Sequence, residues 1–194
     1  MEKPVTALPA DTRGILNPQA GASRFGLTRH APGPEVQARV ERHWIVRWDL
    51  RGQSPFTQEV LPHPCVNLVF EGGEGRVYGV VRSKFSRRLE GAGVGVGTKF
   101  RPGAFAGFTD VPMASLVGRS LPARDVFGAE IAACDDVVAQ VATVERFLAE
   151  RMPDADPGYD LTRLALDLGY FDLAHFTRHF RRVVGRSPTA FLRA

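Results

Sequence analysis

The sequence has little of what several classes of protein require. Its 194 residues include two cysteines, Cys65 and Cys134, which lie far apart without Cys-x-x-Cys spacing, so neither a disulfide framework nor a zinc ribbon is indicated. No run approaches the ~18 apolar residues of a membrane span, and the N-terminal MEKPVTALPADTRG lacks the apolar core of a signal peptide. We therefore expect a cytoplasmic protein without a membrane partner.

Catalytic signatures are also missing. The sequence contains no nucleophile elbow, no paired His and Glu on a helix and no dinucleotide fingerprint, and its GVGVGT stretch lacks the Gly-Lys-Ser/Thr ending of a phosphate loop. His30, His43 and His63 are scattered singly, and although His63 lies two residues from Cys65, no third metal ligand is evident. The sequence thus predicts no metal, no cofactor and no enzymatic activity.

Basic charge is plentiful at the C-terminal end. The net formal charge of +4 permits a polyanionic partner without requiring one. Between residues 160 and 194, however, there are three aspartates but two histidines and six arginines: Arg163, Arg178, Arg181, Arg182, Arg186 and Arg193. We expect any nucleic-acid contact at this end of the chain.

Period-two hydrophobicity dominates the first two thirds of the chain. In HWIVRWDL, Trp44, Val46 and Trp48 alternate with Ile45 and Arg47, which is the pattern of a strand. Similar runs follow at 58–61, 65–70, 75–81, 85–89, 94–100 and 113–117, after an irregular, proline-containing arm over residues 1–34. Short strands at about ten-residue spacing predict an antiparallel barrel or sandwich rather than a parallel α/β sheet.

Helical periodicity begins after Cys134. Asp135 and Asp136 are candidate N-caps for a helix whose apolar residues run from Val137 to Met152. The segment PDADPG breaks this pattern, and residues 153–159 are predicted to be a linker.

The final stretch, LGYFDLAHFTRHFRRVVGRSPTAFLRA, predicts two helices joined by a tight turn and a last short helix. Gly169 ends the first helix and Asp172 caps the second, as expected for C-cap and N-cap residues. Packing is expected through Leu164, Leu168, Phe176 and Phe180, while a separate stripe faces outward: His175, Arg178, His179 and Arg182. This is the plan of a helix-turn-helix, in which the second helix enters the major groove.

Residue chemistry suggests how such a helix would contact DNA. Arginine can bridge guanine O6 and N7, so we expect His175, Arg178 and His179 to face base edges. Phosphate contacts are expected from Arg181, Arg182 and Arg186, and from the short helix that Ser187 and Pro188 begin.

The same stretch resembles the second helix-turn-helix of the AraC/XylS family of transcriptional regulators. Family-pattern residues recur at fixed spacing over about the last 31 residues: Leu164, Ala165, Gly169, Tyr170, Asp172, Phe176, Arg178, Phe180, Arg181, Gly185, Ser187, Pro188, Phe191 and Arg193. Ala174 stands where the family usually has serine. The resemblance implies a sequence-specific regulator whose partner is double-stranded operator DNA. More weakly, the arm and barrel resemble the cupin-like sensor domains that often precede this module.

The predicted DNA-binding unit is incomplete. The family's domain has two helix-turn-helix units joined by a long helix, on the order of 100 residues, whereas about 40 residues follow Met152. Either the protein is a natural half-module, or an internal segment near Tyr159 and Asp160 is missing. We favour the second, since the join leaves Leu161 and Leu164 without a covering surface.

The expected architecture is therefore α+β, with a cupin-like barrel over residues 1–133, a helix and linker over 134–159 and the partial helix-turn-helix over 160–194. The barrel is expected to bind an unknown small-molecule effector or to form a homodimer. Large or polar residues on its strands are the pocket candidates: Trp44, Trp48, Asn67, Phe70, Phe100 and Phe108. The alternative is a cupin-like binding protein or small isomerase without DNA binding, which weak DNA affinity at every salt concentration would reveal.

Overall fold

The computed structural model describes residues 14–61, 63–81, 83–153 and 161–192. The chain divides into two compact units, Met1–Pro153 and Asp154–Ala194. The N-terminal unit contains the described strands and the longest of the described helices, whereas the described part of the C-terminal unit is helical.

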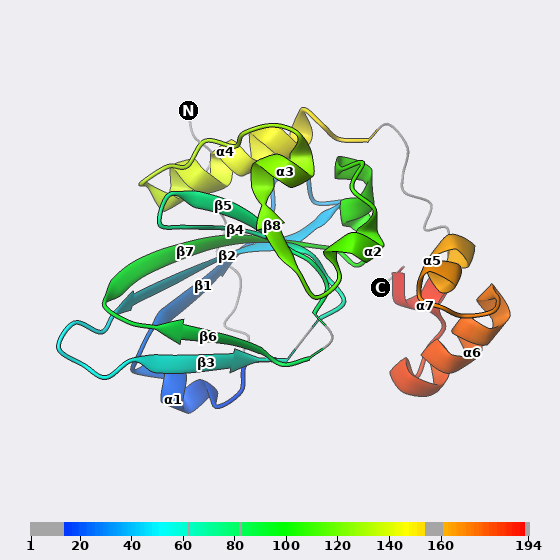
Figure 1. Ribbon diagram of the computed structural model, residues 1–194, viewed down its shortest axis with the longest axis horizontal. Coiled ribbons are helices and arrows are strands. Elements are labelled where there is room, and N and C mark those ends of the chain that lie inside the picture. The colour runs from blue at the N-terminus through cyan, green and yellow to red at the C-terminus, as the bar shows by residue number, and fades with distance from the viewer. Residues whose placement is uncertain (1–13, 62, 82, 154–160, 193–194) are drawn as a thin grey trace. The chain divides into compact units, whose positions relative to one another are not determined.

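Antiparallel strands make up most of the N-terminal unit (Figure 1). Six of them form one sheet in the order β1-β2-β7-β4-β5-β8, and β3 and β6 form a separate two-stranded sheet. Their bounds are Gly26–His30 for β1, Val40–Asp49 for β2, Phe56–Val60 for β3, Asn67–Glu71 for β4, Glu74–Tyr78 for β5, Phe85–Leu89 for β6, Ala92–Phe100 for β7 and Ser120–Pro122 for β8.

The prediction of a closed barrel is not confirmed. In the described residues, β1 and β8 are the two edges of the six-stranded sheet, and the β3–β6 pair forms a ladder of its own. Period-two patterning specifies which face of a strand is buried, but not whether the strands at the two ends of a sheet pair with each other. The predicted antiparallel strands and the mixed α and β character are confirmed.

One predicted strand is wrong. Residues 113–117 contain the helix α2 (Met113–Leu116) instead, which follows Pro112, and the Ser115 hydroxyl donates to the Pro112 carbonyl at 2.7 Å. A short apolar run does not distinguish a strand from one buried helical turn. Leu116, whose side chain is fully buried, anchors this turn in the core.

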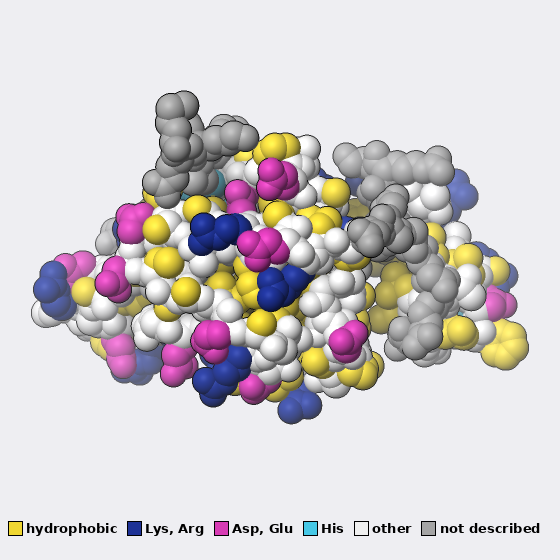
Figure 2. Space-filling view, turned by 90° about the horizontal axis from the view of Figure 1, so that it is seen from above, with side chains coloured by type: hydrophobic (Ala, Val, Ile, Leu, Met, Phe, Trp, Pro, Cys, Tyr) yellow, Lys and Arg dark blue, Asp and Glu magenta, His cyan; other side chains and the backbone are white. Residues whose placement is uncertain are grey.

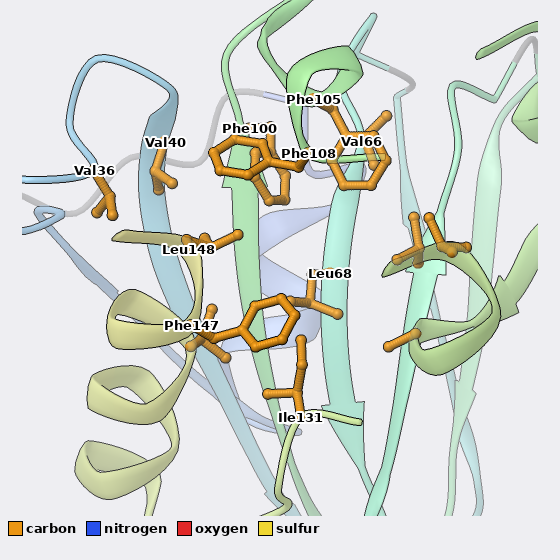
Figure 3. Packing of buried hydrophobic residues seen from close by; sticks show 14 of the residues in the cluster. Val36, Val40, Val66, Leu68, Phe100, Phe105, Phe108, Ile131, Phe147 and Leu148 are labelled. Carbon is orange, nitrogen blue, oxygen red and sulfur yellow. The ribbon is translucent and has the colours of Figure 1, made fainter. Parts of the chain in front are cut away.

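Helices cover one face of the six-stranded sheet. As predicted, Asp136 caps a helix, α4 (Val137–Ala149), and its carboxylate accepts from the amides of Val138 and Ala139. Figure 3 shows Phe147 and Leu148 of this helix pointing toward the strands, where they join a core with Leu68. The shorter helices of this unit are α1 (Pro18–Ala22), the 3-10 helix η1 (Ala104–Phe108) and α3 (Ala123–Phe127).

The C-terminal unit contains α5 (Leu161–Asp167), α6 (Leu173–Val184) and α7 (Pro188–Leu192). Gly169, at φ 80°, ends α5 as predicted: its amide donates to the Leu166 carbonyl, and that of Tyr170 donates to the Ala165 carbonyl, completing a Schellman motif. Asp172 caps α6 by accepting from the His175 amide at 2.6 Å. None of the helices in the described ranges has the length and apolar character that crossing a membrane needs.

Candidate DNA-binding surface and ligand cavity

An aromatic cluster sets the orientation of α6 within the C-terminal unit. Phe176 is buried, with its ring centroid 5.3 Å from that of Tyr170 and 5.6 Å from that of Phe180, and Phe180 in turn lies 5.7 Å from Phe191. Rings on α6 therefore join the turn before this helix to α7. Because these residues occupy one side of the helix, the opposite side is left for solvent or a partner.

That opposite side is basic. Four basic side chains of α6 are exposed: His175, Arg178, Arg181 and Arg182. Among them, His175, Arg178 and Arg182 follow one another at helical spacing. The structure thus brings most of the predicted DNA-binding side chains onto one helix surface. On the N-terminal unit, by contrast, basic and acidic side chains are interspersed over the face seen in Figure 2.

Four predicted contact residues have partners within the protein. The His175 ring lies edge-on to the Tyr170 ring, with centroids 5.2 Å apart. The Nδ1 atom of His179 lies 2.5 Å from the Tyr170 hydroxyl, so only its Nε2 atom is left for DNA. The Arg186 guanidinium lies over the Phe191 ring at 4.9 Å, and the Ser187 hydroxyl accepts from the Ala190 amide at 3.2 Å. Ser187 is therefore first of all the cap of α7.

The packing predicted for this unit is right for Phe176 but wrong for Leu168, which is 55% exposed. The fully buried Ala165 supplies the close contact of α5 instead. Leu168 follows the last residue of α5, so helical spacing no longer places it on the packed face. In the described part of this unit, the other large apolar side chains that are exposed are Leu166, Phe171, Val183 and Val184. The segment expected to be missing near Tyr159 and Asp160 falls outside the described residues.

A cavity of about 270 Å³ lies in the N-terminal unit, lined by residues of the larger sheet and of the β3–β6 pair. Three of the pocket candidates, Trp44, Trp48 and Asn67, line it. The Trp44 indole donates to the Asn67 side-chain oxygen at 3.3 Å, and the Trp48 indole donates to the Glu90 carbonyl at 3.0 Å. The opposite wall includes Val60 and Phe85, from the two strands of the smaller sheet.

The other three pocket candidates belong to the core and not to the cavity. Phe70, Phe100 and Phe108 are all buried in the cluster beneath α4. Successive side chains of a strand point to opposite faces, so Phe70 cannot share a face with Asn67, three residues earlier. Sequence reasoning also missed Arg42 and Lys99, which line the cavity. The alternation in GVGVGT was the available signal, because its glycines and valines occupy opposite faces of β7.

Cys65 and His63 both line the cavity. Burial raises the pKa of the Cys65 thiol to about 11, so at neutral pH it is protonated and a poor nucleophile or metal ligand. Within the described ranges, no three side chains of the types His, Cys, Asp and Glu are grouped as a metal site.

A polar link joins the sheet to α4. His43 is fully buried, with Nδ1 2.9 Å from the Thr98 hydroxyl and Nε2 3.0 Å from the Glu145 carboxylate. Glu145 also accepts from the Gly33 amide at 2.6 Å. Thr98 lies between Gly97 and Lys99 of β7, so this link begins on the reverse side of the strand that floors the cavity.

We expect Glu145→Ala to lower the free energy of unfolding by about 1–3 kcal/mol at pH 7, because it leaves a buried His43 nitrogen without a partner. Burial opposes ionisation of Glu145, but the hydrogen bonds from His43 and Gly33 outweigh it and hold its pKa below its ordinary value. The carboxylate therefore stabilises the fold fully above the ordinary pKa of a glutamate, and this contribution disappears as the pH falls through the lowered pKa.

Denaturant unfolding of the unaltered protein and of Glu145→Ala, at pH 7 and at pH 3, measures the difference in their free energies of unfolding. Glu150→Ala, on a more exposed carboxylate after α4, is the control and should change stability by less than about 0.5 kcal/mol. An equal effect of the two substitutions at pH 7 would contradict the role given to Glu145.

Family comparisons agree with this division of the chain. Residues 155–193 match bacterial regulatory helix-turn-helix proteins of the AraC family, and residues 28–122, from β1 to the end of β8, match a domain of unknown function, DUF6597. No curated protein and no solved structure matches the chain. The match to this helix-turn-helix, together with its exposed basic face, is consistent with a DNA-binding transcription regulator. More particularly, the chain carries an AraC-family helix-turn-helix domain preceded by a DUF6597 domain, as in an AraC-family regulator.

Proposed function

We propose that the protein recognises a specific double-stranded operator through α6 and that a small-molecule effector in the N-terminal cavity controls this binding. The observation that carries the first part is the exposed basic surface of α6 inside the segment that matches the AraC-family helix-turn-helix. The cavity with its two tryptophans supports the second part.

Within this proposal the basic residues have two roles. Arg178 and His175, with the Nε2 atom of His179, meet base edges in the major groove, where arginine can bridge guanine O6 and N7. Arg181, Arg182 and Arg186 meet phosphates, which fix the position of the helix but carry no sequence information directly. Ser187 contributes by capping α7, next to Arg186.

The effector acts in this scheme through α4. An occupied cavity pushes on β7, and the His43–Glu145 link carries a displacement of that strand to the helix. The proposal also includes a homodimer. It divides the chain into a sensor domain over residues 1–133, a helix and linker over 134–159 and a DNA-binding unit over 160–194. This scheme requires two positions of α4, and the effector must bind more tightly to the protein in one of them. An effector with equal affinity for both would not change DNA binding.

Selection from random duplexes, followed by binding measurements over a range of salt concentrations, tests the DNA-binding part. We expect an enriched site, and a logarithmic plot of affinity against salt with a slope of about −3, because three phosphate contacts each contribute about −0.9. A single helix-turn-helix buries little DNA surface, so the affinity should be modest. Little affinity at any salt concentration would favour a binding protein or isomerase that does not use DNA.

A further inference from the structure

We propose, building on the effector role given to the cavity above, that its ligand is an anion with a flat apolar body. The apolar body lies on an indole floor formed by Trp44 and Trp48, and the anionic group lies at the end of the cavity where Arg42 and Lys99 are neighbours. Two independent features of β2 and β7 support this assignment.

The indole floor exists because β7 has glycines where side chains would otherwise stand. Trp44 is the cross-strand partner of Gly97, and Trp48 is that of Gly93. A Cβ atom added to Gly97 would lie 2.0 Å from the Trp44 ring, and one added to Gly93 would lie 2.3 Å from the Trp48 ring. The rings therefore lie against the bare backbone of β7, which gives the cavity a flat aromatic surface suited to a planar ligand.

The basic end results from an irregularity in β2. The pairing of β2 with β7 shifts between Val40 and Arg42, which makes Arg42 the cross-strand partner of Lys99 and leaves Glu41 as the extra residue. Glu41 accepts from the Lys99 ammonium at 2.9 Å and from the Arg42 guanidinium at 3.0 Å. One carboxylate thus serves two cations, and the Lys99 side chain is only 8% exposed.

The other charged residues of the lining do not cancel the excess positive charge at the end with Arg42 and Lys99. Among the other charged residues of the lining, Arg87 is paired with the carboxylate of Glu71. A ligand anion is costly to bury unless it is paired with an opposite charge. The Arg42 and Lys99 side chains supply that charge in surroundings that are otherwise mainly aromatic and aliphatic, so an anion gains more there than a neutral molecule of the same shape.

Two fluorescent probes with the same ring system test this in the full chain. 8-Anilinonaphthalene-1-sulfonate is an anion, and N-phenyl-1-naphthylamine is its neutral counterpart. Trp44 and Trp48 are the two tryptophans of the sequence and both line the cavity, so energy transfer from tryptophan reports a probe bound there. Gly97→Ala, which forces the Trp44 ring into the cavity, should abolish the transfer for both probes and thereby identify the binding site.

We expect Lys99→Met and Arg42→Met each to weaken sulfonate binding about tenfold and to change binding of the neutral probe less than about twofold. Glu41→Gln, which removes the competing carboxylate, should strengthen sulfonate binding severalfold. Arg88→Met is the matched control: it removes one positive charge from the exposed side of β6 and should leave both affinities unchanged. Melting curves verify that each variant is folded.

The outcomes separate the two proposals. If neither probe shows energy transfer that Gly97→Ala abolishes, the cavity is not a ligand site and the effector role fails. If both probes bind there but Lys99→Met, Arg42→Met and Glu41→Gln leave the ratio of their affinities unchanged, the effector role stands and the anionic class is wrong. If Lys99→Met does not fold, the opposite shifts expected for Arg42→Met and Glu41→Gln still decide the question.

Discussion

Replacing Phe100 with alanine should lower the free energy of unfolding by about 3–5 kcal/mol, the range for a fully buried phenylalanine whose neighbours cannot close the space. The Phe100 side chain is completely buried at the end of β7. Its ring centroid lies 4.9 Å from that of Phe105 and 5.6 Å from that of Phe108. Removal of the ring leaves a void beside Phe105 and Phe108 in this buried cluster (Figure 3).

Chemical denaturation followed by circular dichroism measures this loss. Leu61→Ala is the control, because Leu61 is 50% exposed and should contribute less than about 1 kcal/mol. The remaining folded Phe100→Ala protein should still bind N-phenyl-1-naphthylamine, since Phe100 is separated from the cavity by the sheet. Loss of probe binding without a loss of stability would restore Phe100 to the ligand site and contradict the core assignment.

Replacing Arg178 with alanine should weaken binding to the selected DNA site by about 1–3 kcal/mol and relax the preference for one base. The Arg178 side chain is exposed on the face of α6 opposite the buried Phe176. Because the Arg178 side chain is exposed, it is available to contact DNA and is not part of the packed core. The melting temperature should therefore stay unchanged while affinity for the preferred site falls.

Arg182→Ala is the matched variant, since it removes the same side chain one turn further along α6. We expect it to weaken all DNA sequences alike and to reduce the salt slope by about one, the signature of a lost phosphate contact. Binding to the selected site and to a scrambled duplex, each at several salt concentrations, distinguishes the two variants. Identical losses on both duplexes for both variants would contradict the assignment of Arg178 to base recognition.

Local signals account for much of what the sequence predicted. Asp136 and Asp172 cap the helices they were expected to cap, and Gly169 has the positive φ that a C-cap requires, because these features depend on interactions within a few residues. The strand Phe85–Leu89 was predicted with its observed bounds. The basic face of α6 was also readable, since one helix alone determines which of its residues share a side.

Features that depend on distant segments were less readable. Period-two alternation placed Trp44 and Trp48 on one face, but it did not show that this face is the half-buried wall of a cavity, whereas Ile45 is packed beneath α4. The size and apolar character of Phe70 suit either a pocket or the core, and only the register of β4 assigns it to the core. The contact of His179 with Tyr170 and the exposure of Leu168 likewise depend on the folded arrangement of three short helices.

By itself, then, the sequence determined where most helices and strands form, where several of them end and which part of the chain carries the helix-turn-helix, because caps, periodicities and a motif act over short distances. The tertiary structure alone decided that the strands form two sheets rather than a closed barrel and that a cavity lies between them. It also decided that Arg42, Lys99 and Glu41 meet at one end of that cavity. Lys99 is 57 residues away from Arg42 in the chain, and only the pairing of β2 with β7 makes them neighbours.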